Sequence, residues 1–344
     1  MTVIDIPPAR RAMLTNLISS AILYPWLLVA ATWLAIRVGW KWRRKKFVVV
    51  AYDHIFSGLA SHLAARQLNA PVVVCLRGAY GDLQGDRSTW TMRIVDTISR
   101  YTLGRADFVI SKAEHLVKGH EKILGITIDD HVSIPTGLDF AVFDPQRVNL
   151  DQARAAWSAP ESDIRRISYI GRITPEKGLI DLIEGFALVQ TPRTHLLIAG
   201  LYGDAKFVES LRRRIRDLGI EDKVILKDDG IAYDLVPGVL AVSDCIVLLS
   251  KGHHEGVPRI LQEAVAMGTP IVTSESPGIL DAFGGFDGIH FVKSLAEQAI
   301  ADSIDEALRS ANRPSREEAR KRFDIAANYA SYVSLFKQRF DTGS

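Results

Sequence analysis

The sequence predicts an α/β protein made of two doubly wound, Rossmann-like domains that face a cleft. With 344 residues, the chain is too long for one ordinary hydrophobic core. After residue 46, short runs rich in valine and isoleucine alternate with helix-length segments. This alternation is typical of parallel strands joined by right-handed helical crossovers. A polar stretch, Pro145 to Asp163, separates two halves of this kind.

The expected elements follow in chain order. In the first half we expect strands at 47–52, 71–78, 106–111 and 131–135, and helices at 57–69, 90–103 and 114–125. In the second half we expect strands at 165–171, 195–200, 223–228, 244–250 and 270–275, and helices at 179–190, 207–219, 257–268 and 295–308. The predicted organisation is a first domain over 1–148, a linker over 149–164, a second domain over 165–322, and a carboxy-terminal helix over 323–344 that returns to the first domain.

Cysteine usage and charge narrow the class of protein. Cys75 and Cys245 both lie inside strand-like runs, and no zinc spacing surrounds them, so we expect buried thiols in a reducing compartment. The net charge is +2, but residues 1–46 hold eight Lys/Arg and one acid. A basic end that is also strongly apolar favours a membrane surface as partner and argues against nucleic acid.

The amino-terminal segment over 13–46 is expected to be an apolar, basic helix, with two alternatives for its place. Leu17 to Ile36 is a run of twenty residues without a charge, long enough to span a bilayer. Six Lys/Arg follow the run and only Arg10 and Arg11 precede it, so a spanning helix would leave the main body cytoplasmic.

In the other alternative, the helix belongs to the first domain. The expected strand at 47–52 begins directly after the helix, so no linker separates the two. Trp26, Trp33 and Trp40 recur every seven residues and form one stripe that could rest at a lipid interface. Either alternative predicts a protein at the inner face of the membrane.

One loop of the second half has the composition of a phosphate site. GRITPEKG, Gly171 to Gly178, joins an expected strand to an expected helix, at the edge where parallel sheets bind ligands. Arg172 and Lys177 in this loop, beside a helix start, would suit a diphosphate. The alternative is that both are solvated loop cations.

A second loop, KGHHEG at 251–256, leads into the helix that begins at Val257. On a helical wheel Glu263 falls beside the buried stripe, where it could reach the cleft. A carboxylate that accepts hydrogen bonds from two vicinal hydroxyls is a common ribose ligand in doubly wound folds. The alternative is a surface ion pair with Arg259 at i,i+4.

These loops, with the stretch SDCIVLLSKGHHEGVPRILQEAVAMGTPIVTSESPG, resemble the retaining GT-B glycosyltransferases of the bacterial group 1 type that build cell-surface polysaccharides. Glu255 and Glu263 match the E-x7-E pattern of that family. The earlier stretch VSIPTGLDFAVFDP is similar to the end of the family's first domain. The resemblance covers roughly residues 47–340 and is strongest over 165–290.

The resemblance implies a role for each matching residue. Arg172 and Lys177 would hold the donor diphosphate and stabilise it as it leaves, and Gly171 belongs to the same loop. Glu263 would hold the ribose. Glu255 would lie near the donor sugar, with the amides of Gly256 and Val257 around the sugar and phosphate. The site residues that the resemblance implies in this domain are therefore Arg172, Lys177, Glu263, Glu255, Gly256, Val257 and Gly171.

The implied function is transfer of a hexose from a UDP- or GDP-linked sugar to a glycan or lipid-linked acceptor, with retention of configuration and no cofactor beyond the donor. No divalent metal is expected, because the chain has no D-x-D triplet. The alternative function is a non-catalytic relative that keeps the donor site as a membrane-associated assembly partner.

Three departures from the family pattern stand out. The glycine-rich loop that usually opens the first domain is missing, so that domain is expected to be shortened at its amino end. Arg77 stands where many members have a histidine, and it could contact donor or acceptor but could not act as a base. KDDG at 227–230 replaces a more apolar segment near the nucleobase, which leaves the base open.

Overall fold

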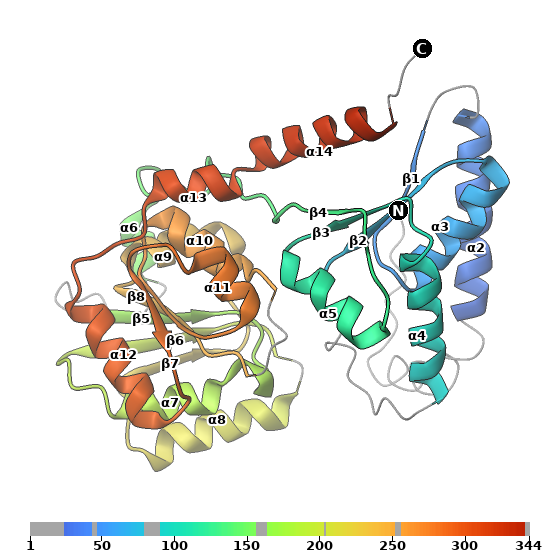
Figure 1. Ribbon diagram of the computed structural model, residues 1–344. Coiled ribbons are helices and arrows are strands. Elements are labelled where there is room, and N and C mark those ends of the chain that lie inside the picture. Colours follow the sequence, from blue (N-terminus) through green and yellow to red (C-terminus); the bar gives the residue numbers. More distant parts are fainter. Residues whose placement is uncertain are drawn as a thin grey trace. The chain divides into compact units, whose positions relative to one another are not determined.

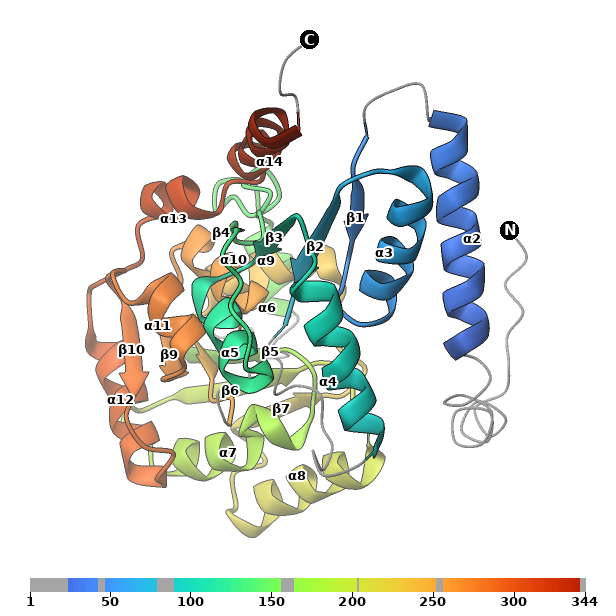
Figure 2. The ribbon, with the colours of Figure 1, turned by 45° about the vertical axis from the view of Figure 1, so that its right-hand side comes forward.

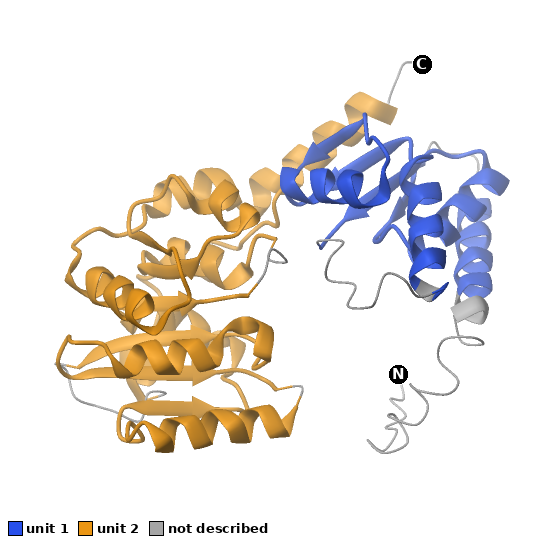
Figure 3. Cartoon of the chain, turned by 60° about the horizontal axis from the view of Figure 1, so that its bottom comes forward, with its two compact units in different colours: residues 1–133 blue, residues 134–344 orange. Residues whose placement is uncertain are grey.

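The computed structural model describes residues 24–42, 47–78, 90–155, 164–202, 204–251 and 256–340. The chain divides into two compact units, residues 1–133 and 134–344 (Figure 3). Each unit contains one parallel β-sheet with helices packed on it. The α/β prediction with two Rossmann-like domains is therefore confirmed.

Unit 1 is built on a four-stranded parallel sheet in the order β1-β2-β3-β4. Its strands are β1 (Val49–Ala51), β2 (Val72–Leu76), β3 (Phe108–Ser111) and β4 (His131–Ser133), and its helices are α2 (Tyr24–Trp42), α3 (Phe56–Leu68), α4 (Trp90–Leu103) and α5 (Glu114–Leu124). The expected shortening of this domain at its amino end stays a prediction.

Helix α2 lies along α3, on the outside of unit 1 (Figure 2). Gly39 is the contact that permits this packing, because a Cβ on Gly39 would lie 2.3 Å from Cδ1 of Leu68. Helix α2 therefore packs on the first domain, which agrees with the alternative in which this helix belongs to that domain. Within the described ranges, no helix is long and apolar enough to cross a membrane. Residues 13–23 and 43–46 of the predicted helix lie outside those ranges.

Unit 2 is built on a six-stranded parallel sheet in the order β10-β9-β8-β5-β6-β7. Its strands are β5 (Arg165–Ile170), β6 (Thr194–Ala199), β7 (Val224–Lys227), β8 (Cys245–Leu248), β9 (Ile271–Ser274) and β10 (Ile289–Val292). The chain winds outward from β5 to β7, returns to place β8 beside β5, and then winds the other way. The switch point between β5 and β8 is where doubly wound sheets bind ligands.

Helices cover both faces of this second sheet (Figure 1). Along β6, Leu196 and Ile198 belong to the main core, whereas Leu197 and Ala199 face Val239 on the other side. The helices of unit 2 as a whole are α6 (Leu150–Ala155), α7 (Leu179–Ala187), α8 (Ala205–Asp217), α9 (Val236–Val242), α10 (Arg259–Met267), α11 (Pro277–Phe283), α12 (Glu297–Arg309), α13 (Arg316–Phe323) and α14 (Ile325–Phe340), with 3-10 turns η3 (Pro175–Lys177) and η4 (Tyr233–Leu235).

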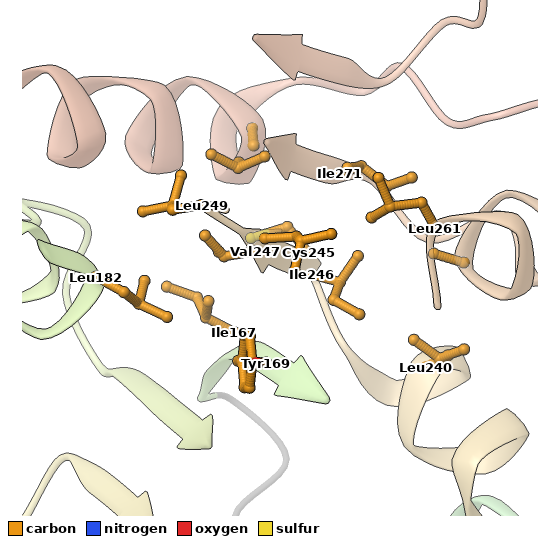
Figure 4. Close-up of a cluster of buried hydrophobic side chains, with 14 of the residues drawn as sticks. Ile167, Tyr169, Leu182, Leu240, Cys245, Ile246, Val247, Leu249, Leu261 and Ile271 are labelled. Carbon is orange, nitrogen blue, oxygen red and sulfur yellow. The ribbon is translucent and has the colours of Figure 1, made fainter. Parts of the chain in front are cut away.

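The core of unit 2 surrounds the central strands β5 and β8 (Figure 4). Ile167 and Tyr169 of β5, with Val247 of β8, are fully or almost fully buried there. Cys245 is buried in the same cluster, and burial raises the pKa of its thiol. Both cysteines are free thiols, with Cys75 only partly buried. This buried centre positions the ends of β5 and β8, after which the two candidate loops begin.

The first residues of unit 2 are bound to its carboxy-terminal helices. Leu138 N donates to Phe323 O at 2.6 Å, and Ile325 N donates to Leu138 O at 3.0 Å. Within the predicted linker, Leu150–Ala155 forms α6, which packs on α9, and residues 156–163 lie outside the described ranges. The predicted return of the 323–344 helix to the first domain stays a prediction.

Candidate functional site

A pocket of about 390 Å³ opens at the switch point of the second sheet. Its walls come from the loop after β5, the end of β8, the start of α9 and the first turns of α10. The residues that line it are Tyr169, Ile170, Gly171, Arg172, Lys177, Tyr233, Val236, Leu248, Pro258, Arg259, Ile260 and Glu263. The pocket therefore joins the loop after β5, with Arg172 and Lys177, to helix α10, which carries Glu263.

The start of the first loop is held against the sheet by backbone contacts. Gly171 N donates to Ala199 O at 3.0 Å, and Tyr169 Oη donates to Arg172 O at 2.6 Å. A Cβ on Gly200 would lie 1.6 Å from Gly171 O, so this approach requires glycine. The backbone of Arg172 is thus fixed while its side chain stays exposed at the pocket.

The end of the loop is held against the strand β8. Gly178 has φ +65°, and a Cβ there would lie 2.1 Å from Leu249 O. Lys251 N donates to Glu176 O at 2.7 Å, which ties the two loops together. Lys177 lies in η3 between these two contacts and lines the pocket. The backbone on both sides of Lys177 is therefore held in place. A site held this way loses little conformational entropy when an anion binds.

On the opposite wall, Glu263 projects from the middle of α10. Only 6% of its side chain is exposed. Burial raises the pKa of Glu263 to about 7, and Arg259 and Tyr233 oppose that rise only in part. Arg259 Nε lies 3.4 Å from Glu263 Oε1, and Arg259 Nη2 donates to Tyr233 Oη at 3.1 Å. The i,i+4 ion pair with Arg259 is therefore present, and the same carboxylate also lines the pocket.

The pocket combines two kinds of chemistry. Arg172 and Lys177 supply positive charge at a position fixed by the β5 loop, and such cations bind phosphate oxygens through charge-assisted hydrogen bonds. A carboxylate offers only acceptors and so suits hydroxyl donors. The arrangement can therefore hold a molecule that has an anionic part and a vicinal diol.

Other predicted site residues lie elsewhere. Gly256 and Val257 are half-buried just before α10 and do not line this pocket. Glu255 lies outside the described residues. Arg77 is an exposed residue of unit 1, with its guanidinium 4.9 Å from the ring centroid of Tyr52.

Sequence reasoning missed part of the lining. Tyr233 and Val236 belong to η4 and α9, a segment in which no element was expected. Pro258 and Ile260, at the start of α10, also line the pocket. The ring of Tyr233 lies at 6.1 Å and 73° to that of Phe143, a contact between residues far apart in the sequence that no local pattern signals.

The described residues contain no group of three His, Cys, Asp or Glu able to hold a metal ion. Asp228, in the segment KDDG, forms an ion pair in which its Oδ2 lies 3.0 Å from Arg212 Nη2. The histidine pair at 253–254 lies outside the described residues.

Two solved structures share the fold of this chain. A glycosyltransferase from Rickettsia africae has a TM-score of 0.77 at 18% identity, over 93% of this chain and 83% of that one. HepE from Anabaena, solved with UDP and glucose, has a TM-score of 0.71 at 18% identity, over 89% of this chain and 81% of that one. These matches support the two-domain fold.

Curated relatives are also distant in sequence. TuaC of Bacillus subtilis, named for teichuronic acid biosynthesis, is 23% identical over 248 residues, 72% of this chain. The chain spans 58% of the length of that relative. The 2-deoxystreptamine glucosyltransferase of Streptomyces kanamyceticus is 22% identical over 281 residues, 80% of this chain and 70% of that protein.

Family models match both halves of the chain. A glycosyl transferase 4-like domain matches residues 3–137, and the glycosyl transferases group 1 model matches residues 152–327. The second match contains the whole pocket described above. The family match over residues 152–327, the fold and the motifs at the switch point agree with one another. The chain therefore belongs to the group 1 glycosyltransferase family.

Proposed function

We propose that the protein transfers a hexose from a nucleotide diphosphate sugar to a glycan or lipid-linked saccharide, with retention of configuration. The observation that carries this proposal is the single pocket that holds Arg172 and Lys177 from one loop and Glu263 from α10. The cations suit the diphosphate, and the carboxylate suits the ribose hydroxyls. A nucleotide diphosphate contains both groups in one molecule.

The proposed reaction needs no nucleophile from the protein. The bond between the sugar's anomeric carbon and the diphosphate oxygen breaks, and the acceptor oxygen bonds to the same face of that carbon. The acceptor proton moves to the leaving phosphate. Arg172 and Lys177 stabilise the charge that develops on this phosphate, and a preorganised cation pair is effective for that purpose. Glu255 is proposed to orient the sugar, with the amides of Gly256 and Val257 beside it.

We propose a UDP- or GDP-linked donor, with no metal ion and no further cofactor. HepE was solved with UDP and glucose, and a Mycobacterium tuberculosis relative, 26% identical over 196 residues, is named a GDP-mannose-dependent mannosyltransferase. The names of TuaC and of a Salmonella lipopolysaccharide N-acetylglucosaminetransferase support a role in cell-surface polysaccharide synthesis. We propose that this occurs on the cytoplasmic face of the membrane, and that Arg77 contacts donor or acceptor.

Nucleotide binding tests the pocket directly. The full chain is titrated with UDP, GDP and ADP while its thermal unfolding is followed. A nucleotide at 100 times its dissociation constant should add about 2.7 kcal/mol of stability. Lys177→Ala should weaken binding by about 1.5–3 kcal/mol, the range for hydrogen bonds to charged groups. Lys206→Ala, an exposed residue at the start of α8, is the matched control.

The outcome that contradicts the site is equal nucleotide affinity in the parent and the Lys177→Ala and Glu263→Ala variants. Sugar transfer is then followed with the nucleotide that binds. The anomeric configuration of the product, read by NMR, tests retention. Full activity after exhaustive chelation supports a metal-independent reaction, whereas activity restored by an added divalent ion contradicts it.

A further inference from the structure

The outer face of α2 exposes several large apolar side chains to water. Its five large apolar side chains that are more than half exposed are Val29 at 67%, Trp33 at 57%, Leu34 at 56%, Val38 at 51% and Trp40 at 59%. The opposite side of the helix is less exposed and includes the buried Gly39 against α3. Contiguous exposed apolar surface of this kind marks a site of contact with a partner or a membrane.

Positive charge lies on the same face. A groove of about 380 Å³ on α2 is lined by Trp33, Ile36, Arg37, Trp40 and Lys41. The guanidinium of Arg37 lies 5.0 Å from the ring centroid of Trp33. In the sequence, no acidic residue occurs between Asp5 and Asp53, whereas eight Lys/Arg occur there. The chemistry of the face is therefore apolar and cationic, without carboxylates.

This combination selects one kind of partner. Helix α2 packs along α3 of the first domain, and a helix that crossed the bilayer would have to give up that contact. A helix that lies in the headgroup layer buries its tryptophans and aliphatic side chains while its cations reach lipid phosphates. We propose that α2 docks flat on an anionic bilayer surface, with a lipid phosphate held in the groove between Arg37 and Lys41. This proposal does not depend on sugar transfer.

Tryptophan fluorescence can report this contact. Four of the six tryptophans of the chain, Trp26, Trp33, Trp40 and Trp42, lie within α2. The full chain is mixed with vesicles of phosphatidylcholine that contain 30% phosphatidylglycerol, with and without brominated acyl chains. Docking predicts a blue shift and bromine quenching that are lost in 1 M NaCl and absent with pure phosphatidylcholine vesicles.

Paired variants locate the contact on α2. Each cation near an anionic surface contributes about fivefold in affinity, so Arg37→Gln with Lys41→Gln should weaken vesicle binding by roughly 25-fold. The matched control is Lys206→Gln with Arg213→Gln, two exposed cations of α8, and it should bind like the parent. Trp33→Ala with Trp40→Ala should lower binding by at least tenfold without a change in melting temperature, because both rings are exposed.

Three results would overturn the proposal. Binding that survives 1 M NaCl and alkaline extraction would indicate a spanning segment. Equal binding to neutral vesicles would remove the phosphate contact. A concentration-dependent dimer that the tryptophan double variant abolishes would show that a second copy covers this face. Nucleotide binding by the same α2 variants should remain unchanged, so failure here is distinguishable from failure of the donor site.

Discussion

Replacing Glu263 by glutamine should make the protein more stable at neutral and alkaline pH. The ordinary pKa of 4.5 rises to about 7 in the folded protein because the carboxyl is buried. The folded state thus binds a proton more tightly than the unfolded state. The corresponding stability is fully present below pH 4.5 and is lost as the pH rises to about 7. A shift of about 2.5 pKa units corresponds to roughly 3 kcal/mol.

Glutamine has nearly the same shape and carries no charge, so Glu263→Gln should lack this pH-dependent loss. At pH 8 the variant should melt roughly 6–12 °C above the parent, from the usual 2–4 °C per kcal/mol for a domain of this size. Well below pH 4.5, at about pH 3.5, the two proteins should melt together, because the carboxyl is then protonated in both the folded and the unfolded state. Thermal unfolding in steps from about pH 3.5 to about pH 8.5 measures both curves, with the exposed Glu209→Gln as control. Parallel curves for parent and variant would refute the reasoning.

Three further predictions concern single side chains. Gly178→Ala should lower the free energy of unfolding by more than about 2 kcal/mol, because the new Cβ would meet Leu249 O. Gly219→Ala is the control: its φ is also positive, at +63°, but nothing lies within 4 Å, so the loss should be only about 1 kcal/mol. Chemical denaturation of the two variants measures the difference. Burial raises the pKa of Asp305, but hydrogen bonds from the loop after α7 lower it on balance. Asp305→Asn should therefore cost about 2–3 kcal/mol at pH 7 and much less at an acid pH where the carboxyl is protonated, as acid titration of unfolding would show. Tyr233→Phe removes a hydrogen bond that lowers the pKa of the buried pocket glutamate, so the pH midpoint of nucleotide binding should move upward.

The strands were the most predictable part of the fold. Runs such as 244–250 contain consecutive Ile, Val and Leu bounded by polar residues, and β8 occupies Cys245–Leu248. The helix at Trp90–Leu103 also has the predicted bounds. Gly268 ends α10 with φ 72°, the left-handed conformation that favours glycine at a carboxy-terminal cap and agrees with the predicted end of that helix at 268. Local patterns suffice where burial on both faces or a glycine cap determines the structure.

Elements that depend on tertiary packing were missed. Helix α9 contains Pro237 and Gly238, which lower helix propensity, yet it forms because Val239 and Leu240 are fully buried. A Cβ on Gly238 would lie 2.9 Å from that of Ala153 in α6, a contact that no local pattern reveals. Strand β10 is short and lies at the sheet edge. The same limit hid Tyr233 from the predicted pocket.

For the site, the sequence located the ligand groups better than their environment. The position of Glu263 beside the buried stripe followed from the helical wheel. Its raised pKa did not, because α10 is buried almost all round, with Gln262 fully buried next to it. The partner of Gln262 is the carbonyl of Thr136, which its Nε2 reaches at 3.1 Å across 126 residues of sequence. Contacts of this range cannot be read from composition or periodicity.

The contact between Leu138 and the end of α13 also limits where the domains of two related chains can be recombined. Two chain segments, one that enters unit 2 and one near its carboxy terminus, are hydrogen-bonded side by side. A Cβ on Gly137 would lie 2.7 Å from Cα of Ile325, so the two backbones touch. A chimera that takes a new first domain should therefore be cut before residue 134, and it should keep the native partner of Leu138. Recombination at the polar stretch after residue 148 would instead leave these two segments from different parents facing each other.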